Sequence, residues 1–354
     1  SSDRYKDNGF QRTMTVLQRL IPVSDQSAWH DAISEVETWP AHSHWYNKAI
    51  STTTENDIFL YYFRAETGAV AVAPICRRWF GDNADIYTPY GNGGFARSGY
   101  FNGFWPAHRN FMMDEGIVCA NISLNQYSPA LELFPPASVE FLKPVFVVDT
   151  TKSMEDLWRS FGRNNRRHLK NWRATASAEF IEDHEQLVDV FLRLYPDFSE
   201  RLGVKQRHRL DCDTLRLLLE NPENAKLIGV RDIGGEISLV RCFLYTETNA
   251  DAFLEASTPD GRGHSRAVYW RAYEWAHDFG IKRLNLSGGI SAGDSLEFFK
   301  KDLGGHRHSL YRTRLIYDPD RYNRLCIQTG NSAALLSGAF FPPYHQLETG
   351  EADA

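Results

Sequence analysis

The sequence predicts an α/β protein with mixed sheets, built as two successive units of similar design. The chain has 354 residues, 42% of them hydrophobic, which is enough for about two domains with complete cores. Apolar strands alternate with amphipathic helices in both halves. An apolar strand ends at Asp149–Thr151, and Ser153 and Asp156 then have the spacing of a helix capping box. We therefore place one unit at 1–149 and the other at 150–316.

The first unit alternates helices and strands along the chain. We expect, in order, a helix near Gln26–Thr38, strands at Ile58–Arg64 and Ala69–Cys76, a loop at Tyr87–Phe95, a helix around His108–Glu115, and strands at Ile117–Ser123 and Val145–Val148.

The second unit repeats this alternation, with a pair of helices before an antiparallel meander and a further helix after it. We expect, by type, helices at Trp158–Arg173, Gln186–Leu202 and Asp213–Glu220, and strands at Glu179–Ile181, Ala225–Arg231, Ile237–Thr246, Asp251–Ser257, Arg283–Leu286 and His308–Ile316.

The composition excludes several classes of protein. Apolar runs are far shorter than the ~20 residues that span a bilayer, and the N-terminal SSDRYKDNGF lacks the apolar core of a signal peptide, so we expect a cytoplasmic protein without a membrane span. Five scattered cysteines have no C-x-x-C spacing, and the closely spaced histidines have no partners at a zinc spacing, so we expect neither disulfides nor a metal. No Walker loop, dinucleotide fingerprint or G-x-S-x-G motif occurs, which argues against a P-loop ligase, a nicotinamide enzyme and a hydrolase.

Positive charge is concentrated in the second half of an acidic chain. The net charge is −6, yet residues 151–315 carry 26 Lys and Arg against 24 Asp and Glu, compared with 11 against 16 in residues 1–150. A local basic face on an acidic protein can bind one polyanion without general affinity for nucleic acid. We therefore expect no DNA partner.

The segment from Arg262 to Gly305 has the most informative order of elements. It contains an aromatic-rich helix, a short strand, a Ser-Gly-Gly turn, and a second, shorter helix. Asp294 and Glu297 have the spacing of a capping box at the start of that helix, and Gly304 is placed to end it in a left-handed conformation.

The shorter helix carries the pair Phe299-Lys300. This order resembles the closing segment of the Fem-type aminoacyltransferases, which have a duplicated acetyltransferase (GNAT-like) fold and transfer an amino acid from tRNA to an amine. The resemblance implies two tandem GNAT-like domains without a coiled-coil arm, with about 317–345 returning to the first domain. In that family a similar Phe-Lys pair lies near the 3′ end of the donor tRNA. The resemblance therefore implies that Phe299 contacts the donor and that Lys300 is catalytic.

The residues of this helix support the same role on chemical grounds. Phe298 and Phe299 are expected to supply its buried side, whereas Lys300 can leave that side for a cleft. Acyl transfer through a tetrahedral oxyanion needs a fixed positive charge or N–H donors where negative charge develops. The alternative is that Lys300 and Lys301 are solvated lysines that complement the helix dipole.

The predicted helix 158–173 has a dry face and a basic face. At 100° per residue, its basic residues lie within one third of the circumference. They are Arg163, Arg166, Arg167, Lys170 and Arg173. No acid occurs from Trp158 to Ala178, so the stripe lacks the carboxylates that usually neutralise a solvated helix, and we expect it to contact tRNA phosphates or a pyrophosphate-bearing acceptor. A second basic cluster that could extend this track comprises Arg201, Lys205, Arg207 and Arg209. An exposed basic helix without a ligand is the alternative.

Two charged residues stand inside apolar strands. Arg241 lies in ISLVRCFLYT and Glu255 in the neighbouring DAFLEAST. A charge at such a position is costly unless it is paired or faces a cleft. Arg241 could hold a carboxylate or phosphate of the acceptor, and Glu255 could take a proton from the acceptor ammonium. If the two share a sheet face, they could instead form a buried structural ion pair.

Two glycine-containing turns are candidates for the acceptor side. Tyr90, Gly93 and Gly94 belong to the loop YGNGG, which resembles the loop that Fem-like first domains present to the cleft, and Ser287 opens the Ser-Gly-Gly turn. Glycines let backbone N–H groups approach a ligand closely. The alternative is that both are ordinary turns, since these dipeptides are common in turns.

These observations favour an aminoacyltransferase that moves an amino acid from aminoacyl-tRNA to an amine of a small peptide, an amino sugar or a cell-wall precursor. Because the ester is already activated, no cofactor is expected. Natural-product tailoring and peptidoglycan synthesis stay open as settings. One alternative is an acyl-CoA N-acyltransferase, although Ser265 stands where a CoA pyrophosphate loop needs its first glycine. A second alternative is a tRNA- or peptide-binding protein without catalytic activity.

Overall fold

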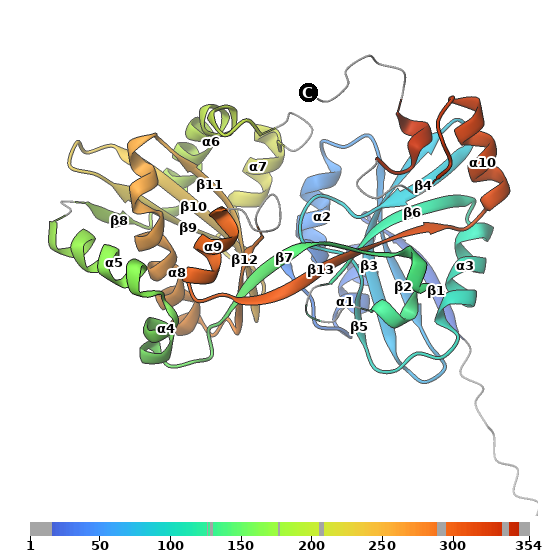
Figure 1. The fold of residues 1–354 in the computed structure, drawn as a ribbon, viewed down its shortest axis with the longest axis horizontal. Coiled ribbons are helices and arrows are strands. Elements are labelled where there is room, and N and C mark those ends of the chain that lie inside the picture. Colours follow the sequence, from blue (N-terminus) through green and yellow to red (C-terminus); the bar gives the residue numbers. More distant parts are fainter. Residues whose placement is uncertain are drawn as a thin grey trace, which may run out of the picture.

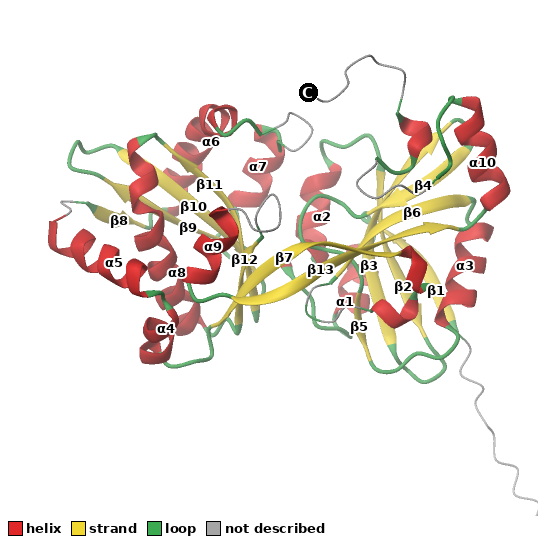
Figure 2. Cartoon of the chain, viewed as in Figure 1, coloured by secondary structure: helices red, strands yellow, loops and turns green. Residues whose placement is uncertain are grey.

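The computed structural model describes residues 16–125, 127, 130–175, 178–204, 209–288, 295–334 and 340–346. Two α/β lobes share one continuous sheet of thirteen strands, as Figure 1 shows. Helices flank the strands in both lobes (Figure 2). The order along the sheet is β1-β2-β3-β4-β6-β13-β7-β12-β11-β10-β9-β8, with β5 paired to β3. The predicted fold class, α/β with mixed sheets, is confirmed.

The first lobe follows the predicted alternation and adds elements at its start. Its helices and strands are β1 (Leu17–Pro22), α1 (Gln26–Ile33), α2 (His44–Ser51), β2 (Asp57–Arg64), β3 (Val70–Phe80), β4 (Asn83–Tyr87), β5 (Ala96–Ser98), α3 (Phe104–Asp114), β6 (Ile117–Leu124) and β7 (Val139–Asp149). Strands β4 and β6 run parallel, whereas the other pairings in this lobe are antiparallel.

The second lobe contains the elements that carry most of the candidate residues. They are α4 (Met154–Ser160), α5 (Arg163–Thr175), β8 (Glu179–Ile181), α6 (His184–Arg201), α7 (Cys212–Leu219), β9 (Ala225–Arg231), β10 (Ile237–Tyr245), β11 (Asn249–Ser257), α8 (Ser265–Phe279), β12 (Arg283–Ser287), α9 (Ser295–Asp302), β13 (His306–Ile316) and α10 (Pro319–Gln328). Strands β11 and β12 are parallel, like β4 and β6 of the first lobe.

The predicted helix 158–173 is wrong in one respect, because it is two helices. Helix α4 starts at the predicted cap, where the Ser153 hydroxyl accepts a hydrogen bond from the Asp156 backbone N–H, and it ends at Ser160. The chain is extended at Phe161, and the N–H of Gly162 donates to the backbone oxygen of Asp302 in α9 at 2.7 Å. This bond to α9 replaces a bond within the helix, so α5 starts in a new direction.

Strands β7 and β13 join the two lobes. Strand β7 is longer than predicted and pairs with β13 on one side and with β12 on the other. In Figure 1 both strands cross from one lobe to the other, so that the two halves of the sheet are continuous. Placed between the lobes, β7 also lies beside the end of β12, where the candidate site is found.

One apolar core extends across both lobes. Trp29 and Tyr46 from the first lobe belong to the same buried cluster as Phe191 and Leu215 from α6 and α7. On the opposite face of the second half-sheet, α4, α5 and α8 cover a separate core. In the C-terminal segment, α10 and Tyr344 pack with residues of β6 in a further cluster. The domain boundaries themselves stay a prediction.

Candidate functional site

The candidate site lies where the parallel strands β11 and β12 diverge. They are paired only from Asn249 to Asp251 on β11, opposite Arg283 to Asn285 on β12, although β11 continues to Ser257. In open α/β sheets, ligands bind in the crevice at the carboxyl ends of parallel strands. Ser287, the last residue of β12, has φ +64°, a left-handed conformation that costs about 1 kcal/mol or more in a non-glycine residue. Such strain is found preferentially at functional sites.

A buried carboxyl group occupies the point of divergence. Asp251 is 4% exposed, and the Asn285 Nδ2 donates to its Oδ1 at 2.7 Å. The Asn285 Oδ1 accepts from the backbone N–H of Ser287 at 2.8 Å, which fixes the amide. Burial raises the pKa of Asp251 to about 7, while the hydrogen bonds from Asn285 and from Asn92 of the first lobe lower it. Asp251 was not among the residues predicted from the sequence. An acid at the start of an apolar strand was the available signal.

Lys300 contacts the residue that follows β12, three positions after the Asn285 that holds Asp251. Its side chain is buried, with 7% exposed, and its Nζ donates to the Gly288 backbone oxygen at 2.7 Å. Gly288 packs so closely on β7 that a Cβ there would overlap the Pro144 carbonyl oxygen. The turn after β12 is therefore held between β7 and the lysine, and hydrogen bonds and backbone link Lys300 through Gly288, Ser287 and Asn285 to Asp251.

The predicted orientation of α9 was partly wrong. Phe298, expected to be buried, is 64% exposed, and Lys300, expected to leave the buried side, is enclosed. Lys300 can be buried because its ammonium group donates a hydrogen bond to the Gly288 carbonyl oxygen, which offsets part of the cost of burying the charge. Phe299 packs as expected, with its ring 6.1 Å from that of Tyr269. Gly304 has φ +91°, which confirms the predicted helix end, whereas Asp294 of the expected capping box lies outside the described residues.

Arg241 and Glu255 lie directly opposite each other in the β10–β11 register and form an ion pair. They therefore share a sheet face and form the ion pair that the sequence left open as the alternative to a role in substrate binding. The Ser265 hydroxyl donates to the Glu255 Oε2 at 3.1 Å, and the Arg241 guanidinium lies 4.3 Å above the ring of Tyr269. The Arg241 Nε is buried without a hydrogen-bond partner in the described part of the chain. Tyr269 connects this pair to Phe299 of α9.

The glycine loop packs against the protein itself. Gly93 and Gly94 are buried, and a Cβ at Gly94 would overlap the Ser123 carbonyl oxygen, so the close approach that requires glycine is to β6. For Gly94, the prediction that the glycine makes room for a ligand therefore loses its physical reason, whereas a Cβ at Gly93 would meet only ordinary van der Waals contacts. Tyr90 contacts the second lobe, where its ring lies 6.2 Å from that of Phe253 on β11. The acceptor role of these residues stays a prediction.

The buried side chain of His42 holds the glycine loop by a hydrogen bond to its backbone. His42 Nδ1 accepts from the Trp39 N–H at 3.1 Å, so its Nε2 donates to the Gly94 oxygen at 2.9 Å. Burial lowers the pKa of His42 to about 4. The ring is neutral at physiological pH, and we assign it a structural role.

The basic surface of α5 is smaller than predicted. Arg166 donates from its Nη1 to three backbone oxygens at the end of α4, at 2.8 to 3.2 Å, and so caps that helix. Arg173 forms a 3.4 Å ion pair with Glu274 of α8. The exposed cations that remain on this face are Arg163, Arg167 and Lys170. Lys205 and Arg207 of the second predicted cluster lie outside the described residues.

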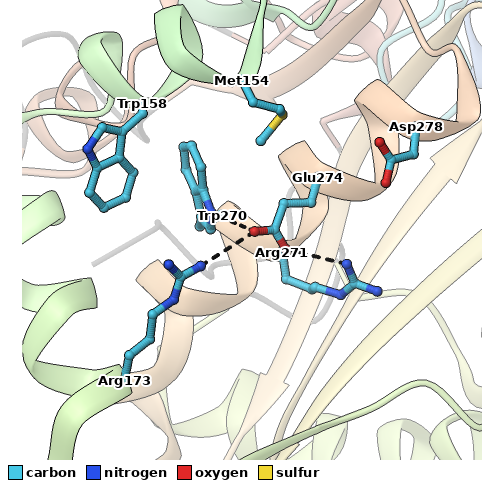
Figure 3. A pocket seen from close by; sticks show the side chains of 7 residues that line it. All are labelled: Met154, Trp158, Arg173, Trp270, Arg271, Glu274 and Asp278. Carbon is cyan, nitrogen blue, oxygen red and sulfur yellow. Dashed lines mark hydrogen bonds and ion pairs between the residues drawn. The ribbon is translucent and has the colours of Figure 1, made fainter.

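A groove of about 430 Å³ lies between α4, α5 and α8 (Figure 3). Its lining residues are Met154, Trp158, Arg173, Trp270, Arg271, Glu274 and Asp278. In Figure 3 the Glu274 carboxylate points between the two guanidinium groups, and it also accepts from the Trp270 Nε1 at 2.8 Å. The two arginines and two carboxylates of the lining leave the groove without a net charge. Neither Asp251 nor Lys300 lines it. We therefore place the candidate site at the strand ends and not in this groove.

No protein-family model matches the sequence, and no curated protein matches it. The fold, however, is similar to solved structures. A crystal structure of FemX aligns with a TM-score of 0.61 at 11% identity, covering 87% of this chain and 99% of that chain. A conserved protein of unknown function from Bacteroides thetaiotaomicron VPI-5482 aligns with a TM-score of 0.55 at 13% identity, covering 85% of this chain and 100% of that one.

A third structure with this fold is the C-terminal domain of a putative lysylphosphatidylglycerol synthetase from Agrobacterium fabrum. Its TM-score is 0.53 at 13% identity, and the match covers 83% of this chain and 91% of that chain. At such low identity these matches establish the fold. Among the described residues, no helix has the length and apolar character needed to cross a bilayer, and no group of three or more His, Cys, Asp or Glu is arranged to hold a metal ion.

Proposed function

We propose that this protein is an acyltransferase that transfers an aminoacyl group from aminoacyl-tRNA to an amine and forms an amide bond. The observation that carries the proposal is the buried ammonium group of Lys300, held beside the carboxyl end of β12 where β11 and β12 diverge. A buried charge is kept in place by its protein partners, of which the Gly288 oxygen is one, and here it is kept beside the strand ends where ligands of open α/β sheets bind.

Lys300 suits the charge that aminolysis of an ester creates. When an amine attacks the ester carbonyl, the carbonyl oxygen becomes an oxyanion, and a fixed cation in a site of low dielectric stabilises it without reorganisation. The Gly288 oxygen holds the Nζ in place, and the turn that bears this oxygen is packed on β7. The remaining catalytic requirements are positioning of the two substrates and removal of a proton from the amine.

Surface charge and the resemblance to Fem-type enzymes both favour aminoacyl-tRNA as the donor. Arg163, Arg167 and Lys170 lie exposed along α5 and can contact phosphates. Phe299, next to Lys300 and packed on Tyr269, offers an aromatic side chain near the proposed reaction centre. Two of the similar folds belong to FemX and to the C-terminal domain of a putative lysylphosphatidylglycerol synthetase. We propose a small peptide, an amino sugar or a cell-wall precursor as the acceptor.

An acyl-CoA donor is the second candidate. Helix α8 starts at Ser265, and its N-cap residue His264 makes no side-chain cap, as at a helix N-terminus that receives a pyrophosphate. The Ser265 N–H itself, however, donates to the Arg262 oxygen of the preceding 3₁₀ helix (Asp260–His264). The Glu255 carboxylate also accepts a hydrogen bond from Ser265 at the same helix end and would repel a pyrophosphate. A binding protein without catalytic activity would keep the basic surface but would not depend on Lys300.

Co-purification separates these functions. The protein is isolated from cells by an affinity tag, the bound RNA is sequenced, and bound small molecules are identified by mass spectrometry. We expect enrichment of one tRNA over total RNA. That tRNA, charged with its amino acid and mixed with the protein and a panel of amines, should then give an amide. Bound CoA without tRNA enrichment would contradict the proposal, and tRNA enrichment without transfer to any amine would support the binding protein.

A further inference from the structure

We propose that Asp251 is the base that takes a proton from the attacking ammonium group of the acceptor. This inference rests on the proposed function and names the residue that performs a step for which Lys300 is unsuited. It starts from the position of Asp251, which lies at the last paired position of β11 and β12. Ligands of open α/β sheets bind outside the carboxyl ends of parallel strands, which is where this position lies.

Both lobes hold this carboxyl group. Asn285 of β12 donates to it, and Asn92, from the loop that follows β4, hydrogen-bonds to it from the first lobe. The Asn285 amide cannot rotate freely because its oxygen accepts from the N–H of Ser287. Asp251 therefore lies between the loop proposed for the acceptor and the turn held by Lys300. That is the position a base needs if the acceptor enters from the first lobe and the ester lies on α9.

The other candidate bases nearby are engaged. Glu255 forms an ion pair with Arg241 and accepts from Ser265. His42 uses both ring nitrogens within the protein. Asp251 accepts from amide groups, and no ion pair to a cation is present among the described residues.

The surroundings give Asp251 the proton affinity that the step requires. Burial raises its pKa to about 7, and the bonds from Asn285 and Asn92 oppose this rise. The titratable group coupled to it from α2 is Tyr46, whose own pKa burial raises well above the usual value, so that the phenol stays neutral. The Tyr46 hydroxyl donates to the Tyr90 oxygen. A base whose pKa lies near the working pH combines a useful ionised fraction with useful basicity.

The step balances as follows. The Asp251 carboxylate takes one proton from the acceptor ammonium, and the neutral amine attacks the ester carbonyl. The C–N bond forms, negative charge develops on the carbonyl oxygen near Lys300, and the C–O bond to the ribose then breaks. The second proton of the former amine passes to the departing ribose oxygen. The proton on Asp251 leaves to solvent, and no oxidant, metal or nucleotide is consumed.

The test is the pH dependence of kcat/KM for transfer in wild type, Asp251→Asn and Asn92→Ala. In wild type we expect a rise through about pH 7. Asp251→Asn should lower the rate by about 10²–10⁴ and abolish this rise, because an amide cannot accept the proton. Asn92→Ala removes a donor that favours the ionised form, so its profile should shift to higher pH. A residue with a purely structural role would change the rate without moving the profile.

Glu255→Gln is the matched comparison, because it neutralises the other carboxylate on β11. It should retain the rise through pH 7. If Asp251→Asn transfers with the wild-type profile, or if Glu255→Gln loses the rise instead, the assignment of Asp251 is wrong while the proposed function stands. If the wild-type protein transfers from no aminoacyl-tRNA, the proposed function itself fails.

Discussion

Replacing Lys300 by methionine removes the buried charge while preserving most of the side-chain volume. A unit charge about 4 Å from a developing oxyanion contributes about 4 kcal/mol at an effective dielectric constant of ~20. One tenfold in rate corresponds to about 1.4 kcal/mol, so the full interaction would be worth up to ~10³. Single oxyanion donors typically contribute ~10²–10³. We expect Lys300→Met to lose about this factor in turnover.

Lys301→Met is the matched control, since Lys301 is the next residue of α9 and is exposed. It removes the same charge from the same helix and should lose little. The assay is single-turnover transfer from aminoacyl-tRNA at saturating enzyme, which separates chemistry from binding. Thermal unfolding of both variants checks that the fold is retained. Equal losses at the two lysines, or none at Lys300, would refute the oxyanion role.

Three further predictions concern the surface, the turn after β12 and the buried acid. The first variant reverses the exposed charges of α5, at Arg163, Arg167 and Lys170. It should weaken tRNA binding and lower the slope of log K against log salt by about 2–3, because each of the three phosphate contacts releases roughly 0.7–0.9 counterion. An unchanged slope would leave the stripe without a phosphate role. Gly288→Ala should lower the free energy of unfolding by about 1–3 kcal/mol in chemical denaturation, because the added Cβ would overlap the Pro144 carbonyl oxygen. Gly263→Ala is the control and should change this free energy little, because the space around Gly263 is open. Because the pKa of Asp251 is raised in the folded state, this residue contributes most to the free energy of unfolding below pH ~4, and its contribution falls by at most about 4 kcal/mol as the pH rises to 7. Asp251→Asn should lack this part of the pH dependence. Identical plots of unfolding free energy against pH for the wild type and Asp251→Asn would contradict the raised pKa.

The strands β9, β10 and β11 of the second lobe were predictable because local patterns determine them. Strand β9 has the predicted bounds, and the apolar runs of β10 and β11 were placed within two residues at each end. The pairing of Arg241 with Glu255 was not predictable, because the register depends on a β-bulge at Cys242–Phe243 that the alternation of residues does not reveal.

The candidate site was only partly predictable because contacts distant in sequence create it. Lys300 was found through a resemblance, yet its burial depends on a carbonyl oxygen twelve residues earlier. Asp251 obtains its environment from β12 and from the loop of the first lobe, so its own strand shows only an acid at the start of an apolar run and not the contacts that bury it. Arg166 matched the basic face of α5, but the break at Phe161 turned it toward the end of α4.

The central claim is that the donor is aminoacyl-tRNA, and a double-label experiment tests it directly. The protein is mixed with tritiated aminoacyl-tRNA, prepared from total tRNA and all amino acids, together with carbon-14 acyl-CoA and an amine panel. The isotopes in the purified amide product are then counted. We predict tritium in an amide that depends on Lys300, with no carbon-14 above the level without enzyme. Carbon-14 in the product without tritium would contradict the account and identify an acyl-CoA N-acyltransferase.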